Sequence, residues 1–274
     1  MRVLDLFSGI GGFSLGFQRC GFETTMFCEI DKYCQKVLAK NFPGVPIHDN
    51  IKTLTGDKLP KDIDLICGGF PCQDISVAGK RRGIIKDETR SGLWFEMARV
   101  ISEVRPKYVI VENVAALLNN GMGVVLGELS EMGYDAEWGV ISARDVGAPH
   151  LRKRVWILGY PKHDGSPTTT KQGSIRQAVC DDKEGQNQTS ELEGASTSSM
   201  LAYTTSKRLE RNIRGLPKEQ RLTRGCGSWP TEPDVGRVAH GIPNRVDRIK
   251  GLGNAVVPQI PELIGRVIKE EPCT

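Results

Sequence analysis

The sequence lacks the features that define several large classes of protein. No apolar stretch approaches the length of a membrane-spanning helix, and the N-terminus lacks the pattern of a signal peptide. The eight cysteines include no Cys-x-x-Cys pair, and the four histidines are not spaced as metal ligands. No internal repeat is present either. These absences predict a cytoplasmic protein with mostly reduced core cysteines, no metal and no membrane partner.

The charge and composition are ordinary for a globular chain. Hydrophobic residues make up 39% of the sequence and charged residues 26%. A formal net charge of only +4 permits binding to a polyanion but does not require it. At 274 residues the chain is long enough for one α/β domain and a small second lobe. We expect a monomer.

A candidate nucleophile follows one predicted buried strand. Residues 63–67 form a short apolar run that ends in two glycines, a pattern typical of a strand that leads into a loop. Pro71 and Cys72 come next, at the edge where open α/β sheets bind their ligands. A thiol at that point is well placed to act as a nucleophile. Taken alone, however, Cys72 is better interpreted as a free buried cysteine.

The start of the chain resembles a nucleotide-binding turn. Residues 2–7 are predicted to form a strand, and three glycines between positions 9 and 12 form a tight turn before a helix. Glycines there let the backbone approach a ligand at which the helix N-terminus points. The third glycine of the dinucleotide fingerprint is missing. A plain turn between a strand and a helix is the alternative.

Glu29 directly follows the second predicted strand, residues 24–28. An acid at that place can accept hydrogen bonds from both hydroxyls of a ribose, in an NAD enzyme or in an S-adenosylmethionine enzyme. The alternative is an acid that precedes a helix over residues 31–40 and stabilises its N-terminus. Glu29 therefore predicts a nucleotide-like cofactor without deciding which one.

A second candidate for the site is an acid at the end of another predicted strand. Residues 107–111 form this strand, which brings Glu112 to the same edge of the sheet as Cys72. A carboxylate is costly to bury without a partner, so Glu112 alone could equally be a structural residue at a strand end. The pair of Cys72 and Glu112 is a better candidate than either residue alone.

Four ordered motifs resemble those of the DNA cytosine-5 methyltransferases of bacterial or phage type. They are residues 5–12, 71–73, 112–114 and 253–258, and the resemblance covers roughly residues 1–160 and 236–270. Four motifs in order are far more specific than any one of them. The resemblance implies an α/β protein with the Rossmann-like S-adenosylmethionine-dependent methyltransferase fold, a mainly parallel sheet and a small target-recognition lobe.

The same resemblance implies the reaction. A methyl group would pass from S-adenosylmethionine to C5 of a flipped-out cytosine in double-stranded DNA, at a specific short sequence. Cytosine C5 is too weak a nucleophile unaided, so the Cys72 thiolate would first add to C6 and make C5 an enamine carbon. Glu112 would hold or protonate N3, and Arg154 would lower the pKa of the Cys72 thiol. Loss of the C5 proton and of the cysteine would restore aromaticity.

The resemblance also implies contacts with the cofactor and with DNA. Asp49 would hydrogen-bond the adenine amino group, and Arg152 and Arg154 would contact a phosphate and the flipped cytosine. His150 stands where the family usually has glutamine. The expected cofactor-binding residues are Phe7, Gly9, Gly11, Glu29, Asp49, Pro71 and Asn254. The expected DNA-binding residues are Gln73, Ser76, Arg152, Arg208 and Arg211.

The chain divides into three predicted parts. Residues 1–160 form the catalytic and cofactor-binding domain, and residues 236–274 return to it with a closing helix over residues 260–269. Residues 161–235, which we expect to be partly flexible, are left to recognise the target sequence. Within them, residues 203–224 carry seven basic side chains against two acids, a composition suited to phosphates and guanine edges. A solvated helix or loop is the alternative for such a charge run.

Three other functions remain as alternatives. A tRNA cytosine-5 methyltransferase of the same family would usually carry a Cys-Phe-Thr signature, which this chain lacks. A nicotinamide-dependent oxidoreductase would explain the glycine turn and Glu29, but would give no reason for Cys72 with Glu112. A catalytically inactive DNA-binding relative is disfavoured because Cys72 and Glu112 are both present. Bacterial members of the family imply a restriction-modification context.

Overall fold

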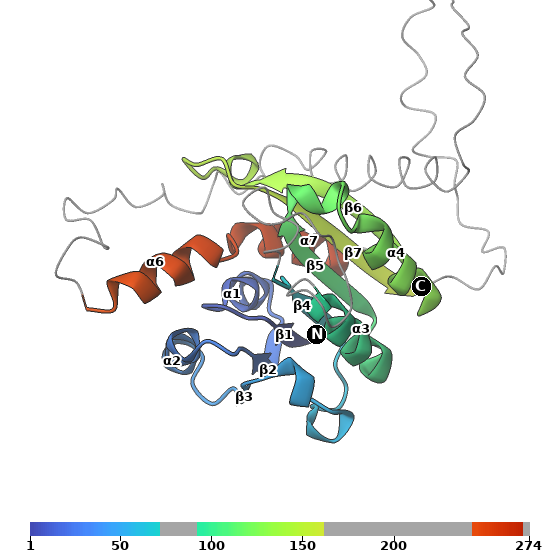
Figure 1. Ribbon diagram of the computed structural model, residues 1–274, viewed down its shortest axis with the longest axis horizontal. Helices are drawn as coiled ribbons and strands as arrows, with labels where there is room; N and C mark the ends of the chain where they lie inside the picture. Colours follow the sequence, from blue (N-terminus) through green and yellow to red (C-terminus); the bar gives the residue numbers. More distant parts are fainter. Residues whose placement is uncertain (72–91, 162–242, 271–274) are drawn as a thin grey trace, which may run out of the picture.

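A seven-stranded sheet forms the centre of the fold (Figure 1). The computed structural model describes residues 1–71, 92–161 and 243–270. Within these ranges the strand order is β3-β2-β1-β4-β5-β7-β6, and β7 runs antiparallel to both neighbours while the other pairs are parallel. The strands are β1 (Arg2–Leu6), β2 (Glu23–Cys28), β3 (Ile47–His48), β4 (Leu65–Gly68), β5 (Tyr108–Val114), β6 (Tyr134–Ser142) and β7 (Lys153–Pro161). The predicted mainly parallel α/β sheet is confirmed.

Helices cover both faces of the sheet, which is why its strands are apolar on both sides. Successive strand residues alternate between two apolar clusters: Leu4 and Leu6 belong to one, and Val3 to the other. The first cluster includes residues of α3 (Leu93–Val104) and α4 (Met122–Glu131). The second includes residues of α1 (Gly12–Arg19) and α7 (Gln259–Glu270). Figure 1 shows α2 (Lys32–Asn41) near the β2–β3 edge.

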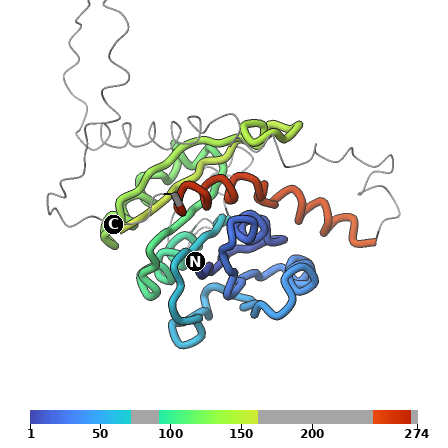
Figure 2. Tube along the Cα trace, turned by 180° about the vertical axis from the view of Figure 1, so that it is seen from behind, coloured from blue at the N-terminus to red at the C-terminus, as the bar shows by residue number. Residues whose placement is uncertain are grey.

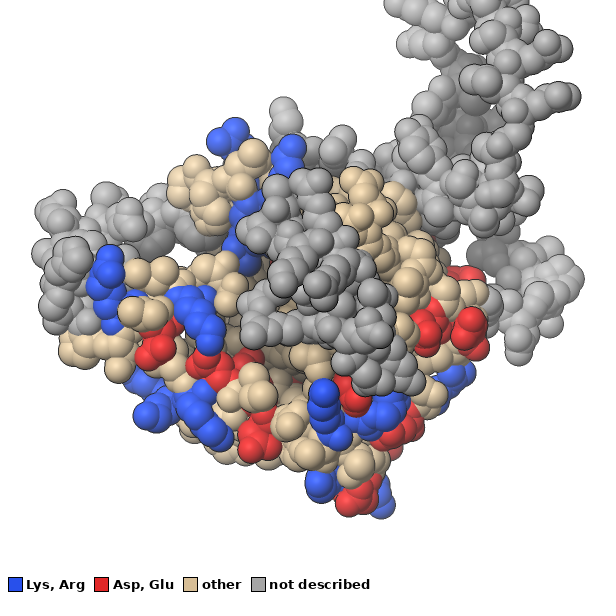
Figure 3. Space-filling view, in the orientation of Figure 1, with Lys and Arg blue, Asp and Glu red and all other residues tan. Residues whose placement is uncertain are grey.

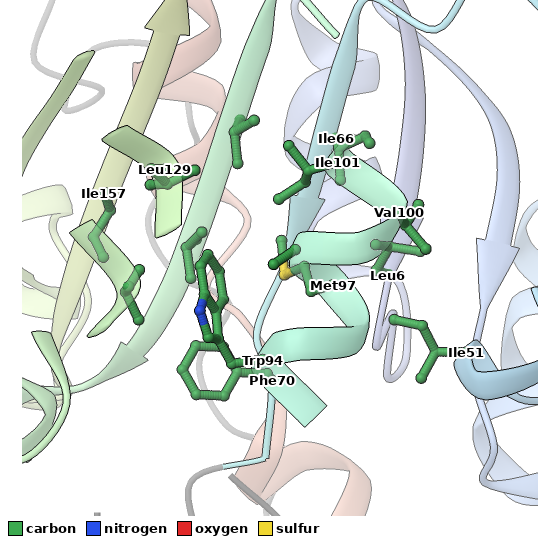
Figure 4. Packing of buried hydrophobic residues seen from close by; sticks show 14 of the residues in the cluster. Leu6, Ile51, Ile66, Phe70, Trp94, Met97, Val100, Ile101, Leu129 and Ile157 are labelled. Carbon is green, nitrogen blue, oxygen red and sulfur yellow. The ribbon is translucent and has the colours of Figure 1, made fainter. Parts of the chain in front are cut away.

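The packing of α3 fixes the chain just after β4. Trp94 and Phe70 are almost fully buried, with their ring centroids 5.6 Å apart. Figure 4 shows this pair at one end of α3, with Met97, Val100 and Ile101 following along the helix. Burial of each large side chain contributes about 1.5–3 kcal/mol. The backbone that leads from β4 to Pro71 is therefore held by the core.

The late part of the chain packs against the first helix through two glycines. A Cβ atom on Gly12 would lie 2.5 Å from the carbonyl oxygen of Val256, and one on Gly16 would lie 2.3 Å from that of Pro258. Only glycine allows so close an approach of two backbones. The predicted closing helix is confirmed as α7, which packs against α1 and places Glu262 3.2 Å from Arg19.

One helix was missed by the sequence analysis. Helix α6 (Arg245–Asn254) precedes α7, and Figure 2 shows from behind how the two follow each other while α6 extends away from the sheet. Its apolar residues Val246, Ile249 and Leu252 are exposed. The segment also contains Gly251 and Gly253, which disfavour a helix, so its sequence gives only a weak helical signal. The remaining helical turns are η1 (Ile51–Thr53), η2 (Gly56–Lys58), η4 (Ala115–Leu118) and η5 (Ala143–Val146).

Some predictions fall outside this part of the chain. The proposed target-recognition segment, residues 161–235, lies outside the described residues from position 162 onward, and the division into three parts stays a prediction. Among the helices in the described ranges, none has both the length and the apolar character needed to cross a bilayer.

Candidate active site

A cavity of about 770 Å³ lies at the carboxyl ends of the parallel strands. This is the edge at which open α/β sheets bind ligands, and the volume is in the usual range for a small-molecule site. The residues that line it come from the ends of β1, β2, β3, β4 and β5, from the start of β7 and the segment before it, and from α2, η1, α3 and α6. Those predicted from the sequence are Phe7, Gly9, Glu29, Asp49, Pro71, Glu112, Arg152, Arg154 and Asn254.

The turn after β1 is held in place by Glu29. Phe7 and Gly9 both have positive φ values, 53° and 55°, so the backbone turns sharply into the cavity. The Gly9 N–H donates to one oxygen of the buried Glu29 carboxylate, and the Asp31 N–H donates to the other, both at 2.7 Å. Each carboxylate oxygen can accept a further hydrogen bond. Glu29 therefore orders the turn and keeps acceptor capacity for a hydroxyl group.

Gly11 has a different place from Gly9. Its φ is +88°, and a Cβ atom there would lie 2.6 Å from Phe42 and 3.0 Å from Leu38. Gly11 therefore packs against the end of α2 and is not among the described residues that line the cavity. Its direct contact with a cofactor stays a prediction, whereas its role in the turn follows from its backbone.

A buried acid, Asp5, connects the strand before the same turn to the helix after it. Asp5 on β1 is fully buried, and the Ser14 hydroxyl at the start of α1 donates to its carboxyl at 2.7 Å. Burial raises the pKa of Asp5 to about 7, against the hydrogen bonds from Ser14. Asp5 lies within the first motif, but the sequence could not indicate that its side chain ties β1 to α1.

The opposite wall of the cavity carries an ion pair of Glu112 and Arg154. The Arg154 Nε lies 3.1 Å from Glu112 Oε1, and the Glu112 carboxyl is largely buried. Burial raises the pKa of Glu112 above its ordinary value, although the charges of Arg154 and Arg152 act in the opposite direction. A carboxyl in this environment can hold or deliver a proton at a pH where an exposed glutamate would be fully ionised.

Glu112 lies inside β5 and not beyond its end, which corrects the predicted strand of residues 107–111. The strand continues to Val114 because β7 pairs with it there, with Glu112 opposite Trp156. Gly69 leaves room for the carboxyl, since a Cβ atom on it would lie 2.9 Å from Glu112 Oε2. The backbone pairing therefore fixes the direction of the Glu112 side chain.

Asn113 joins the strand that bears Glu112 to the chain that leads to Cys72. Its side-chain amide donates to the Phe70 carbonyl at 3.1 Å, in a buried position. Pro71 lines the cavity next to it. Cys72, Gln73 and Ser76 lie outside the described residues, as do Arg208 and Arg211. Asn113 belongs to a motif found in the sequence, but its structural role was not predicted.

Arg99 was also missed, and it supports the wall beside Asp49. Its guanidinium donates to the carbonyls of Ile51 and Leu54, at 2.8 and 2.9 Å, and pairs with Glu96 and Glu103 on α3. Because Ile51 lines the cavity, Arg99 holds that wall against α3. In the sequence, Arg99 is only one polar residue on the outer face of a helix.

In the described ranges, no group of three or more His, Cys, Asp or Glu side chains could hold a metal ion. The polar groups of the cavity instead gather at two walls, with the Glu29 turn at one and Glu112 with Arg154 at the other. A mainly parallel sheet with this cavity at its carboxyl edge and with β7 inserted antiparallel between β5 and β6 defines a Rossmann-like α/β fold.

Residues 1–222 match the family model of the C-5 cytosine-specific DNA methylases, and the chain belongs to this family. The match favours a methyltransferase over a nicotinamide enzyme, which was the alternative from another class. The matched residues include the first three of the four motifs, and the motif at residues 253–258 lies beyond them.

Two relatives show how far the likeness extends. The Type II methyltransferase M1.ScrFI of Lactococcus lactis subsp. cremoris is 38% identical over 198 residues, which cover 66% of this chain and 50% of the relative. The Type II methyltransferase M2.BsuMI of Bacillus subtilis (strain 168) is 43% identical over 166 residues, which cover 58% and 41%. The chain thus spans about half the length of the curated relatives it matches.

A solved structure supports the fold over almost the whole chain. The S. pombe Dnmt2 methyltransferase has a TM-score of 0.59 with this protein and covers 98% of this chain and 99% of its own. The sequences are only 17% identical, so this likeness concerns the fold alone.

Proposed function

We propose that the protein transfers a methyl group from S-adenosylmethionine to C5 of a flipped-out cytosine in double-stranded DNA, at a specific short sequence. The observation that carries the proposal is a single cavity with the Gly9–Glu29 turn at one wall and the Glu112–Arg154 pair at the other. Pro71, which leads directly to Cys72, lines the same cavity. We also propose that the protein is a monomer and acts in the cytoplasm.

The described residues fit S-adenosylmethionine. The cavity has room for a nucleoside with an amino-acid tail, and no atom would lie within 4 Å of a Cβ on Gly9, so the backbone there faces open space. Glu29 would accept the ribose hydroxyls, and Asp49 would accept from the adenine amino group. When bound, the cofactor would supply a methyl group on a positively charged sulfur.

Replacement of Glu29 by alanine tests the cofactor assignment. We expect affinity for S-adenosylmethionine to fall roughly 10- to 100-fold, because hydrogen bonds to a charged group and the order of the Gly9 turn are both lost. Calorimetric titration measures the affinity, and Glu29→Gln, which keeps one acceptor oxygen, should lose less. An affinity for NAD above that for S-adenosylmethionine would overturn the proposal.

In the proposed reaction Cys72 and Glu112 act on opposite sides of one base. The Cys72 thiolate forms a bond to C6 while Glu112 delivers a proton to N3 or holds one there, so the ring electrons move toward C5. C5 could then accept the methyl group that the bound cofactor would supply, and the broken bond from methyl to sulfur would leave that sulfur as a neutral thioether. The proton on N3 would return to Glu112, the C5 proton would leave to a base, and the bond from C6 to the Cys72 sulfur would break, which returns the thiolate and the aromatic ring.

Arg154 supports both partners of this step. Its guanidinium contacts Glu112 now, and a fixed positive charge at the same wall would favour the thiolate form of Cys72. Arg152 also lines the cavity and donates to the Gly253 carbonyl at 2.7 Å. The two arginines therefore provide positive charge at the wall where the base and its phosphate are proposed to lie.

The basic run of residues 203–224 tests the proposed recognition segment. Neutralising a phosphate contact, for example with Arg208→Gln, should weaken binding to all DNA sequences. It should also reduce the slope of the logarithm of the binding constant against the logarithm of the salt concentration by about one. Replacing an arginine that contacts a base, for which Arg211 is a candidate, should cost about 1–3 kcal/mol and relax the site at one position. Binding titrations over a range of salt separate the two. Unchanged affinity and site preference throughout the run would place recognition elsewhere.

One experiment tests the whole proposal. DNA from cells that express the protein is sequenced with a readout for 5-methylcytosine, and we expect methylation at one short sequence. Cells that express the Glu112→Gln variant serve as the control. Methylation of tRNA with unmodified DNA would overturn the proposal in favour of the other branch of the family.

A further inference from the structure

Helix α6 lies beside the cofactor cavity with little packing to hold it. Within this helix, which is described in full, Gly251 is the only buried residue, and it faces Ile10 and Tyr33. In Figures 1 and 2 the helix runs past α1 on the side of α2 and extends away from the sheet. Most of the surface of α6 is therefore exposed, and its only buried position in the described part of the chain is Gly251.

An ion pair and a hydrogen bond connect the C-terminal part of α6 to the two walls of the cavity. The Lys250 Nζ lies 2.5 Å from Asp31 Oδ2, and the Gly253 carbonyl accepts the hydrogen bond from Arg152. Lys250, Asp31 and Arg152 all line the cavity. Figure 3 shows basic and acidic side chains next to each other on this face of the molecule. The Asp31–Lys250 pair thus joins the cofactor wall to a helix 219 positions away in the sequence.

The two carboxylate oxygens of Asp31 contact different partners. Oδ1 accepts from the N–H groups of Tyr33 and Cys34 and so caps α2, while Oδ2 pairs with Lys250. The hydrogen bond from Lys250 is the main reason that the pKa of Asp31 lies below its ordinary value. The Asp31 N–H also donates to Glu29. A movement of α6 is therefore coupled to the residue proposed to hold the ribose.

The chain after α6 is fixed, so the helix has a point about which it can move. Val256 packs closely over Gly12, and Pro258 over Gly16. Between this anchor and the start of α6, the Asp31–Lys250 pair links the helix to the cofactor wall, while Arg152 links the end of the helix to the other wall. Opening the pair would release α6 from the cofactor wall without disturbing the sheet.

We propose that Lys250 is a positioning residue for the cofactor cavity: its ion pair with Asp31 holds α6 along one side, and the pair opens when the cofactor enters or leaves. This inference rests on the proposed use of S-adenosylmethionine. It assigns to α6 a role in the rate of cofactor exchange, in addition to the cofactor contact expected of Asn254.

Release of bound S-adenosylhomocysteine, measured by rapid mixing with excess S-adenosylmethionine, tests the inference. We expect Lys250→Met and Asp31→Asn each to release the product roughly two- to fivefold faster, as suits the strength of an exposed ion pair. The double variant should release it no faster than either single variant, because both remove one interaction. Asparagine is chosen because it can still cap α2.

Lys107→Met is the matched control. Lys107 pairs with Asp64 at 3.1 Å and is about as exposed as Lys250, at 68% against 62% of the side chain, but it precedes β5 and so lies at the amino edge of the sheet. The Lys107→Met variant should release the product at the wild-type rate. Higher salt should speed release from the wild type and have less effect on Lys250→Met.

The outcomes distinguish this inference from the proposed function. If the wild type binds S-adenosylhomocysteine and the variants at positions 31 and 250 release it at the wild-type rate, the role of the ion pair is wrong and the proposed function stands. Additive effects in the double variant would also overturn it. If the wild type binds neither form of the cofactor, the proposed function itself fails.

Discussion

Replacement of Cys72 by serine is expected to abolish methylation and to leave cofactor binding nearly intact. A serine hydroxyl does not form a useful fraction of anion at neutral pH, so nothing adds to C6, and the rate should fall by several orders of magnitude. Transfer of a labelled methyl group to DNA measures the first effect. Calorimetric titration with S-adenosylhomocysteine measures the second, since the residues that line the cofactor wall are unchanged.

DNA that contains 5-fluorocytosine gives a direct test of the covalent step. The C5 fluorine cannot leave as a proton does, so the wild type should remain bound to the base through sulfur, and Cys72→Ser should not. Cys20→Ala is the control, because Cys20 is half-buried against α7 and donates to the Glu262 carbonyl. It should be trapped like the wild type. Peptide mapping of the adduct to any other cysteine would rule out the assignment.

The second large effect is expected for Glu112→Gln. The amide keeps the shape of the side chain but cannot deliver a proton to N3, and a positioned acid contributes about 10²- to 10⁴-fold to a rate. Glu137→Gln is the matched control, since Glu137 is a buried carboxyl on β6 that accepts from the Tyr160 hydroxyl and is not among the residues that line the cavity. A loss below tenfold in Glu112→Gln would mean that Glu112 is structural.

The pH dependence of the methylation rate tests whether Glu112 acts as an acid. Because burial raises the pKa of Glu112, its protonated form persists to higher pH than in an exposed glutamate, and is lost as the pH rises through that pKa. The wild-type rate should therefore fall on the alkaline side as Glu112 loses its proton. Glu112→Gln should lose this alkaline fall. An unchanged profile would contradict the role as an acid.

The parts that could be predicted from the sequence are those set by local pattern. The strands read as short apolar runs because both faces of the sheet are buried, and the residues that follow them must meet at one edge. That is how Glu29, Pro71 and Glu112 were found, and all three line the cavity. Gly11 was assigned with them because a glycine turn does not reveal which glycine faces the ligand.

The parts that could not be predicted depend on contacts between distant residues. Helix α6 has no apolar face against the core, and its glycines at 251 and 253 disfavour a helix, so its sequence gives only a weak helical signal. Lys250 and Arg99 are ordinary charged residues until the fold places them beside Asp31 and the Ile51 carbonyl. No rule of spacing links such positions, because their proximity results from the packing of whole elements.

The contact between α1 and α7 also bears on how the protein is made. Arg19 and Glu262 are 243 positions apart, so the partner of α1 emerges from the ribosome more than two hundred residues after α1 itself. At about 5–20 residues per second, the apolar side of α1 waits more than ten seconds for its cover. Phe13 and Phe17, which end up buried beneath α7, are exposed to other chains and to chaperones during that time. Packing of α7 therefore covers this face of α1 late in synthesis, after which α1 is no longer available for association.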